Sequence, residues 1–259
     1  MSKYPRTKKS LGQHFLTDGN IIRKIADAIP AKTDDLIVEI GPGSGAVTKV
    51  LLEKFNHVKA IELDQRMVEY LSEEYPELEV IHKDVLEYDW SVHEDEDRDI
   101  HVIGNLPYYI TSQIMFGLFE HRSVLSSATL MMQKEVAERI VAEPRSKQYG
   151  ILSVQSQLMS SPEILFDVSP HVFSPPPNVH SSVIQFMFDK AELACTDAHL
   201  KEVVRMAFNQ RRKKLSNALK RLDAELPADE FNFNLRAEAL KPSMYEKLTA
   251  RLEQLGTFQ

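Results

Sequence analysis

Short apolar runs alternate with amphipathic segments along the first half of the chain. Residues 36–40, LIVEI, form an apolar run of strand length, which is typical of a strand buried on both faces. Residues 18–29 place apolar side chains at helical intervals, with Asp18 positioned to cap the helix and Pro30 to end it. The same periodicities predict strands at 58–63, 78–84, 99–105 and 127–133, and helices at 46–55 and 111–120. Strands that alternate with helices predict an α/β fold on a mostly parallel sheet.

The pattern changes near residue 190, where strands give way to helical spacing alone. A proline-rich stretch at 170–181 and a strand at 182–188 precede this point. Helical patterns then follow at 197–208, 211–222, 228–240 and 243–255. We therefore expect two domains: an α/β domain over residues 1–190 and a small, all-helical C-terminal domain over residues 191–259.

The composition excludes several classes of protein. A chain of 259 residues that is 43% hydrophobic and 27% charged can bury a large core without a disulfide or a metal. Its one cysteine, Cys195, excludes an internal disulfide framework and a multi-cysteine zinc site. No apolar run is long enough to cross a bilayer, and the basic N-terminus lacks the apolar stretch of a secretory signal. We expect a cytoplasmic protein that binds no membrane and no metal and is, by default, a monomer.

The net charge of −7 is unevenly distributed along the chain. Residues 1–24 carry six Lys or Arg against one acidic residue, and residues 201–221 carry eight against one. Residues 62–99, in contrast, carry fifteen Asp or Glu against three basic residues. Basic patches on an acidic protein can bind phosphate locally, so the overall charge does not exclude a nucleic-acid partner. The alternative is that both patches are ordinary solvated surface.

A glycine or a polar residue stands at the carboxyl end of four successive predicted strands: Gly41, Glu62, Asp84 and Asn105. Ligands of parallel sheets bind beyond these ends. Gly41 opens the loop GPGSG, whose glycines permit a tight turn and bring a ligand close to the N-terminus of the next helix. Glu62 stands where a carboxylate can accept hydrogen bonds from ribose hydroxyls, and Asp84 can either accept one from an adenine amino group or cap a turn. The pattern favours a nucleotide-like cofactor, NAD or S-adenosylmethionine, over a purely structural turn.

The segment Asn105-Leu106-Pro107-Tyr108 indicates methyl transfer to an amine. The exocyclic amine of a purine is a poor nucleophile, because its lone pair is delocalised into the ring. The Asn105 side-chain oxygen and a backbone carbonyl, for which Leu106 is the candidate, can accept its two hydrogens and stabilise the developing positive charge. Alignment of amine, methyl carbon and sulfur supplies the rest without a general base. Pro107 stiffens the turn, and Tyr108 offers a ring for the base to stack on, worth about 1–3 kcal/mol. The alternative is an ordinary strand-ending turn.

These segments together resemble the ribosomal RNA small-subunit adenine dimethyltransferases, the kasugamycin-resistance family. The resemblance extends over nearly the whole chain, and its matching stretches are LGQHFL (11–16), VEIGPGSGAVT (38–48), IELD (61–64), GNLPYYI (104–110), LMMQKEVAERI (130–140), YGILSV (149–154) and VFSPPPNVHSSV (172–183). It implies a Rossmann-like, seven-stranded S-adenosylmethionine-dependent methyltransferase sheet, with an antiparallel strand at 182–188. It also implies dimethylation of the N6 amino groups of two adjacent adenines near the 3′ end of small-subunit (16S) rRNA, in an assembling small ribosomal subunit.

The resemblance also implies roles for individual residues. The cofactor contacts of the family fall on His14, Leu16, Gly41, Glu62, Asp84 and Asn105, and the adenine would be held between Tyr108 and Phe173. The target adenine would have to leave its stack, which favours single-stranded or loop RNA. A helix with Gln-His-Phe-Leu at its N-terminus would close over the cofactor. Phosphates of the rRNA would be bound by Arg211, Arg212, Lys213 and Lys214. The chain departs from the commoner family pattern at His14 and Tyr109, each of which replaces an asparagine.

Three alternatives remain open from the sequence. An NAD-dependent dehydrogenase would explain the glycine loop and Glu62, but would leave the Asn-Leu-Pro-Tyr segment unexplained. An assembly factor that checks the small subunit, with incidental methylation, would use the same residues as the enzyme. The related erythromycin-resistance methyltransferases act on large-subunit rRNA; the helical domain and the VFSPPPNV loop favour the small-subunit branch by resemblance.

Overall fold

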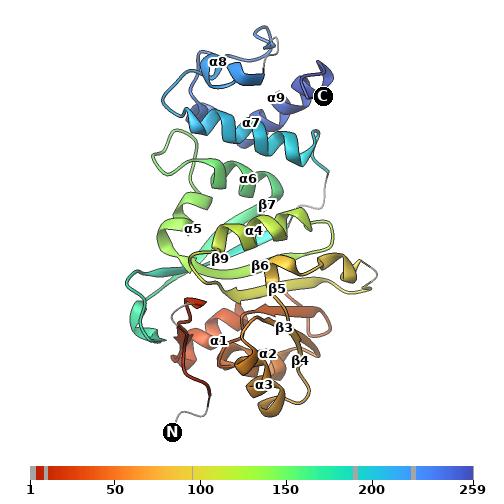
Figure 1. Cartoon of the computed structure of the whole chain (residues 1–259), viewed down its shortest axis with the longest axis vertical. Helices are drawn as coiled ribbons and strands as arrows, with labels where there is room; N and C mark the ends of the chain where they lie inside the picture. Colours follow the sequence, from red (N-terminus) through yellow and green to blue (C-terminus); the bar gives the residue numbers. More distant parts are fainter. Residues whose placement is uncertain (1–3, 9–10, 95, 189–191, 223–225, 259) are drawn as a thin grey trace. The chain divides into compact units, whose positions relative to one another are not determined.

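The structure is a computed structural model, and it describes the chain except for residues 1–3, 9–10, 95, 189–191, 223–225 and 259. The chain divides into two compact units. Figure 1 shows the chain coloured by residue number. Unit 1 combines Met1–Ala137 with Pro162–Phe188, and unit 2 combines Glu138–Ser161 with Asp189–Gln259. The chain therefore passes from one unit to the other three times, after residues 137, 161 and 188. The pattern change near residue 190 indicates only the last of these boundaries. Residues 189–191, at the predicted boundary, lie outside the described part of the chain.

The main sheet has seven strands in the order β4-β3-β2-β5-β6-β9-β7. In chain order its strands are β2 (Leu36–Ile40), β3 (His57–Glu62), β4 (Glu79–His82), β5 (Ile100–Asn105), β6 (Ser127–Gln133), β7 (Ser160–Val168) and β9 (Ser181–Phe188). Strands β2 to β6 pair in parallel, and β9 runs antiparallel to β6 with Val183 opposite Met131. Figure 1 shows β5, β6 and β9 as neighbouring arrows. This sheet confirms the predicted Rossmann-like α/β fold and its antiparallel strand.

The helices of the first half of the chain follow the predicted periodicity closely. They are α1 (Gly19–Asp27), α2 (Ala46–Lys54), α3 (Gln65–Glu74) and α4 (Thr111–Glu120), with short 3-10 turns η2 (Val85–Glu87) and η3 (Trp90–His93). The Asp18 side chain caps α1 as predicted, accepting hydrogen bonds from the N–H groups of Asn20 and Ile21. All five residues of β2 are buried, because the strand is covered on both faces. Burial of each large apolar side chain contributes roughly 1.5–3 kcal/mol.

A second, two-stranded sheet pairs β1 (Phe15–Leu16) with β8 (Phe173–Ser174), which follows the 3-10 turn η4 (Pro170–Val172). Leu16 stands opposite Phe173 in this sheet. Residues 13–16, predicted at the start of a helix, do not form one: Phe15 and Leu16 form β1 and α1 begins at Gly19, so this prediction is wrong. The reason is that the segment pairs with a distant stretch of chain, and two-residue strands leave no periodic signal in the sequence.

Unit 2 contains α6 (Ile151–Met159), α7 (Asp197–Asn209) and α9 (Pro242–Gln254), which pack together. The helices predicted at 211–222 and 228–240 are wrong. Only α8 (Leu215–Ala218), η5 (Lys220–Leu222) and η6 (Ala237–Ala239) form there. The N–H of Leu215 donates to the carbonyl of Leu235 at 2.9 Å, and Asn232 turns the chain by accepting from the N–H of Asn234 at 3.0 Å. The backbone here therefore forms hydrogen bonds with distant residues of unit 2 instead of the regular hydrogen bonds of a long helix.

Three observations limit other kinds of site. Within the described ranges no helix is long and apolar enough to cross a membrane. In the same part of the chain, no three His, Cys, Asp or Glu side chains gather to hold a metal ion. Cys195 is buried, and burial raises the pKa of its thiol to about 12, which keeps it protonated and unreactive.

Candidate active site

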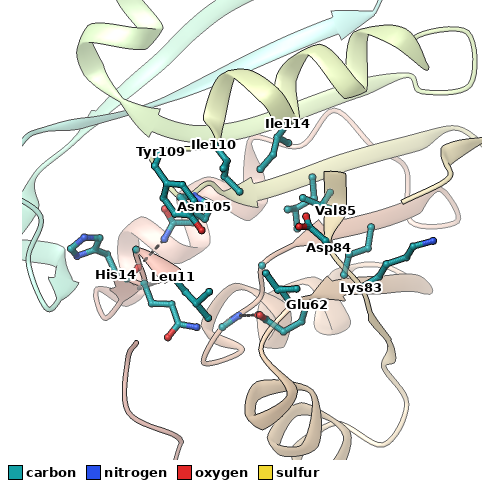
Figure 2. A pocket seen from close by; sticks show the side chains of 18 of the residues that line it. Leu11, His14, Glu62, Lys83, Asp84, Val85, Asn105, Tyr109, Ile110 and Ile114 are labelled. Atoms are coloured by element: carbon teal, nitrogen blue, oxygen red, sulfur yellow. Dashed lines mark hydrogen bonds between the residues drawn. The ribbon is translucent and has the colours of Figure 1, made fainter. Parts of the chain in front are cut away.

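A cavity opens at the carboxyl ends of β2, β3 and β5, where the sequence predicted a ligand (Figure 2). The N-terminal segment 11–15 forms part of its wall, and the strand ends contribute Gly41, Glu62, Asp84 and Asn105. A second cavity shares His14 and Asn105 with the first and adds Leu16 and Glu39. All six residues that the resemblance assigned to the cofactor therefore line one of two adjoining cavities. Their contacts with a cofactor remain predictions.

The glycine loop leaves space for a ligand at Gly41 in particular. Gly41 has φ +65°, and a Cβ built on it would meet no atom within 4 Å. Gly43 has φ +53°, and a Cβ there would lie 2.7 Å from the Phe15 ring. Gly43 and Gly41 thus need glycine for different reasons: Gly43 because a side chain packs on it, and Gly41 because its φ is positive while it faces open cavity. A close approach of cofactor to backbone fits the site at Gly41.

Glu62 presents a fixed carboxylate to the cavity. Its Oε2 accepts a hydrogen bond from the N–H of Gly43 at 3.2 Å, and its Oε1 accepts one from the N–H of Asp64 at 2.8 Å. Figure 2 shows Glu62 in the cavity wall. Burial raises the pKa of Glu62, while these two N–H groups oppose the shift. Each oxygen keeps acceptor capacity beyond its one backbone bond. The carboxylate is suited to bind hydroxyl groups such as those of a ribose.

Asp84 follows β4 and takes the capping role, one of the two that the sequence left open. Its Oδ1 caps η2 by accepting from the N–H of Leu86 at 2.9 Å. The residue also lines the cavity, as Figure 2 shows. Its other oxygen takes no hydrogen bond from the described residues, so it is available to a ligand amino group.

The Asn105 amide is oriented by the N-terminal segment. Its Nδ2 donates a hydrogen bond to the carbonyl of His14 at 2.9 Å, which fixes the amide with Oδ1 as its remaining acceptor. Oδ1 accepts nothing from the described part of the chain. The next residue, Leu106, donates its N–H to the Met131 carbonyl at 3.0 Å, and its own carbonyl likewise receives no bond from a described residue. Two neighbouring carbonyl-type oxygens thus lack a donor among the described residues; Asn105 lines both cavities, whereas Leu106 is 1% exposed and lines neither.

Tyr108 is held next to these acceptors. Its hydroxyl shares a 2.7 Å hydrogen bond with the Ser181 hydroxyl, and burial raises its pKa, so it stays a neutral phenol. Its ring stacks on the His14 ring with centroids 6.1 Å apart and planes inclined by 22°. The His14 ring is in turn held by a 2.7 Å hydrogen bond between Nδ1 and the Pro175 carbonyl. Tyr108 is thus a fixed ring between His14 and Ser181, and it lines neither of the two cavities.

Phe173 was predicted to stack on the target adenine, but its side chain is buried in the core. It is 4% exposed and belongs to the hydrophobic core, next to Leu16 in the small sheet. The structure therefore brings Asn105, Leu106 and Tyr108 together but leaves Phe173 buried. Its stacking on a base stays a prediction, and it requires the β1–β8 segment to move.

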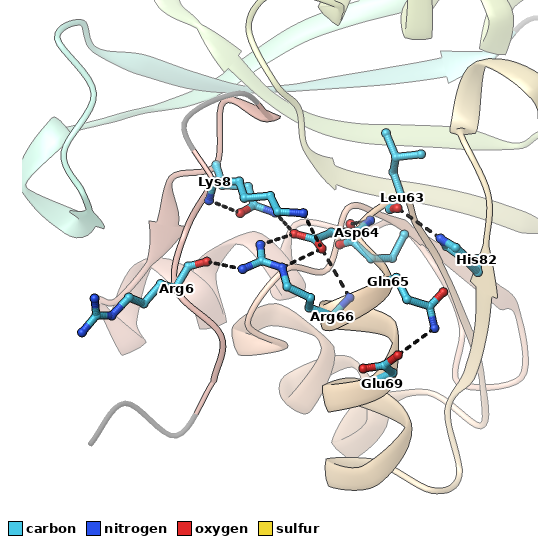
Figure 3. Close-up of polar contacts among 10 residues, drawn as sticks. Arg6, Lys8, Leu63, Asp64, Gln65, Arg66, Glu69 and His82 are labelled. Carbon is cyan, nitrogen blue, oxygen red and sulfur yellow. Dashed lines mark hydrogen bonds and ion pairs between the residues drawn. The ribbon is translucent and has the colours of Figure 1, made fainter.

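Asp64 was not singled out from the sequence, yet it fastens the N-terminal segment beside the cavity (Figure 3). The buried Asp64 carboxylate receives hydrogen bonds from the Arg66 guanidinium and from Lys8 and Gln13, the last two at 3.4 Å. Hydrogen bonds from Arg66 lower the pKa of Asp64 to about 2, so the carboxylate is always charged near neutrality. The IELD stretch carried the only sequence signal for this residue. Of the N-terminal basic patch, Lys3 and Lys9 lie outside the described residues.

The four basic residues at 211–214 do not share one environment. The Arg211 guanidinium is fully engaged within unit 2, with Nε on the Glu238 carboxylate at 2.8 Å. Arg212 and Lys213 are exposed, and Lys214 donates to the side chain of Asn234 at 3.0 Å. Phosphate binding by this group remains a prediction, and Arg211 is the member least free to take part.

Glu39 is a second residue that the sequence did not single out, because it sits inside the apolar run LIVEI. It is fully buried in β2, and its Oε2 accepts a 2.6 Å hydrogen bond from the Thr48 hydroxyl. Burial raises the pKa of this carboxyl to about 7. The group is therefore protonated in the folded protein at pH values where it would ionise in the unfolded chain.

We expect Glu39 to make the folded state less stable as the pH rises. Between pH 4.5 and about 7 the unfolded chain releases this proton while the folded protein retains it, and the accumulated loss is about 3 kcal/mol. Glu39→Gln should remove this pH-dependent loss of stability. The free energy of unfolding, measured in urea at pH 5 and pH 8, should therefore differ less between the two pH values than in the wild type. Exposed Glu53 on α2 supplies the control, since Glu53→Gln should leave the difference unchanged. An unaltered pH dependence in Glu39→Gln would contradict the buried-acid assignment.

The fold and the site together define an S-adenosylmethionine-dependent methyltransferase. The structure superposes with a TM-score of 0.80 on a dimethyladenosine transferase from Plasmodium falciparum, at 27% identity, with 94% of this chain and 98% of that chain covered. The 23S rRNA methyltransferase ErmE superposes with a TM-score of 0.67 at 25% identity, with 93% of this chain and 100% of that chain covered.

Sequence comparison defines the family within that class. The family model described as Ribosomal RNA adenine dimethylase matches residues 5–250. The chain is 47% identical to Ribosomal RNA small subunit methyltransferase A of Chlorobium chlorochromatii, over 90% of this chain and 89% of the relative. It is 45% identical to the protein of that name in Salinibacter ruber, over 96% and 86% respectively. The chain belongs to the ribosomal RNA adenine dimethylase family, which confirms the predicted family, enzyme class and cofactor and removes the dehydrogenase alternative.

Proposed function

We propose that the chain dimethylates the N6 amino groups of two adjacent adenines near the 3′ end of small-subunit rRNA, in an assembling small ribosomal subunit. The observation that carries this proposal is the orientation of Asn105, whose Nδ2 is held by the His14 carbonyl and whose Oδ1, like the carbonyl of the next residue Leu106, receives no hydrogen bond from a described residue. The relatives named for the small subunit are up to 47% identical to this chain, whereas ErmE, named for 23S rRNA, is 25% identical. This difference favours the small-subunit substrate over the large-subunit alternative.

The residues of the site suit a purine amine in a defined way. Asn105 Oδ1 and the Leu106 carbonyl would each accept one amine hydrogen. This would reduce delocalisation of the nitrogen lone pair into the purine ring and stabilise the positive charge that develops on the nitrogen. Tyr108 would hold the base by stacking, with Phe173 on the other face once it is exposed. Bound S-adenosylmethionine supplies the methyl group. No side chain needs to take the amine proton, because it can leave to water after transfer.

Each of the remaining predicted residues would contact a different part of the cofactor. Glu62 would accept hydrogen bonds from the ribose hydroxyls, and Asp84 would accept one from the adenine amino group. Gly41 permits close approach to the loop, since its Cβ position is open. His14 and Leu16 would contact the cofactor from the N-terminal segment. Because His14 meets Asn105 through its backbone carbonyl, replacing the commoner asparagine there leaves this contact intact.

Methylation of isolated subunits tests the proposed function. Incubated with labelled S-adenosylmethionine, the protein should label small subunits from cells that lack the enzyme, and mass spectrometry should place four methyl groups on two adjacent adenines, since each is dimethylated. Large subunits are the matched control and should remain unlabelled. Label on large-subunit rRNA instead would contradict the substrate, and tight subunit binding without label would favour the assembly-checking alternative.

We also propose that the protein acts as a cytoplasmic monomer. Sedimentation of the purified protein at assay concentration should give the mass of one chain, and cell fractionation should recover it with assembling subunits.

A further inference from the structure

Arg211 ties three segments of unit 2 together. Its Nη1 donates to the carbonyl of Lys147 at 2.8 Å, and its Nη2 donates to the carbonyl of Ser146 at 2.9 Å. Its Nε donates to the Glu238 carboxylate at 2.8 Å. Each of its three nitrogens donates to a partner within unit 2, so protein groups hold the guanidinium in place. Its evident effect is to hold the loop at 145–147 beside the turn that carries the neighbouring basic residues.

The loop that Arg211 holds is also constrained at Arg145. This residue has φ +71°, in the left-handed region that favours glycine, and its N–H donates to the Glu238 carbonyl at 2.7 Å. A non-glycine residue in that region is strained, and it persists only when its surroundings hold it there. Both the backbone and the side chain of Glu238 therefore serve to fix this loop.

The fixed loop brings further positive charge to the basic turn. Arg145, Lys147, Arg212 and Lys213 are all exposed, and none of them makes an ion pair with any described residue. Glu238, the acidic residue placed to neutralise them, is occupied by Arg211. Glu143, at the start of the loop, is exposed and is the remaining carboxylate of this segment. The result is a surface with four unpaired cationic groups from two distant parts of the sequence.

We propose that Arg145 and Lys147 bind rRNA phosphates together with Arg212 and Lys213, and that Arg211 is the positioning residue that assembles this surface. The proposal rests on the proposed function, because it takes the partner to be RNA of the small subunit. Phosphate is the chemistry that fits: unpaired Arg and Lys side chains on a fixed backbone neutralise a charged, repeating backbone without sequence preference.

Neutralising the loop tests the surface directly. Arg145→Gln with Lys147→Gln should weaken binding to small subunits by about tenfold or more near physiological salt. It should also lower the slope of log affinity against log salt by about 1 for each phosphate that the protein no longer neutralises. The control, Arg205→Gln with Lys247→Gln, removes the same charge from exposed positions on α7 and α9. It should change binding much less. Equal losses in both pairs, or an unchanged salt slope in the loop variant, would overturn the proposal.

Arg211→Lys tests the positioning role, because it keeps the charge but loses the fork that binds two carbonyls and a carboxylate. It should weaken subunit binding, and adding the loop substitutions to it should cost clearly less than they cost in the wild type. Fully additive losses would show that Arg211 does not act through the loop. Binding of S-adenosylmethionine, followed by calorimetry, should be the same in all these variants. If the wild type itself neither binds small subunits nor methylates them, the proposed function fails instead of the surface.

Discussion

Asn105→Ala is expected to lower methyl transfer to small-subunit rRNA by at least about a hundredfold, while small-subunit binding persists. The reason is that the substitution removes Oδ1, the acceptor proposed to stabilise positive charge as it forms on the amine. That charge is largest in the transition state, so the rate constant should fall far more than the affinity for rRNA. Single-turnover methylation and filter binding on the same preparation would measure the two effects.

A matched asparagine makes the result interpretable. Asn56, just before β3 at the other end of the sheet, also uses its Nδ2 in one hydrogen bond, to Asp34 Oδ1 at 2.6 Å. Asn56→Ala therefore removes a comparable interaction and should leave the methylation rate close to that of the wild type. Turnover retained by Asn105→Ala would remove Asn105 from the chemistry. Loss of subunit binding along with turnover would instead point to a fold or docking defect.

Gly41→Ala should reduce the affinity for S-adenosylmethionine by about tenfold or more and leave the protein folded. The added methyl group would enter open cavity, so no protein atom clashes with it, but a ligand close to the loop would. The strained φ of +65° costs roughly 1–2 kcal/mol of folding stability in addition. Calorimetry for the cofactor, paired with urea unfolding, separates the two effects.

Two other glycines calibrate this result. Gly256 has φ +72° and equally open space but lies at the end of α9, so Gly256→Ala should show the same strain with unchanged cofactor affinity. Gly43→Ala should lose more stability even without cofactor, because its Cβ would lie 2.7 Å from the Phe15 ring. Unchanged cofactor affinity in Gly41→Ala would mean that the cavity beside this glycine is not where the cofactor binds.

Both predictions concern positions that the sequence placed at strand ends and that the structure places in the cavity wall, and the reason for this agreement is local. A parallel strand is a short apolar run, its ligand-facing residues follow directly after it, and strand, loop and helix N-terminus are contiguous in the chain. Gly41, Glu62, Asp84 and Asn105 could therefore be placed at one edge of the sheet from their spacing. The strand LIVEI was predicted with its observed bounds for the same reason.

The residues that the sequence missed act through contacts with distant parts of the chain. Asp64 gathers Lys8 and Gln13 from the N-terminal segment, which spacing along the chain does not reveal. Glu39 lies within an apolar strand pattern, so its buried carboxyl carried no signal. The helix predicted at 211–222 was wrong because the backbone of Leu215 pairs with that of Leu235.

The sequence by itself determined the α/β class, the strands and helices of the first half of the chain and the strand ends that line the cavity, because all of these follow from local periodicity and from glycine and proline conformation. Only the tertiary structure decided that Phe173 is buried against Leu16, that the His14 carbonyl orients Asn105, and that Arg211 binds a loop instead of standing free. Those outcomes depend on which distant backbone and side-chain groups meet, and hydrogen bonds between distant segments leave no periodic trace in the chain that makes them.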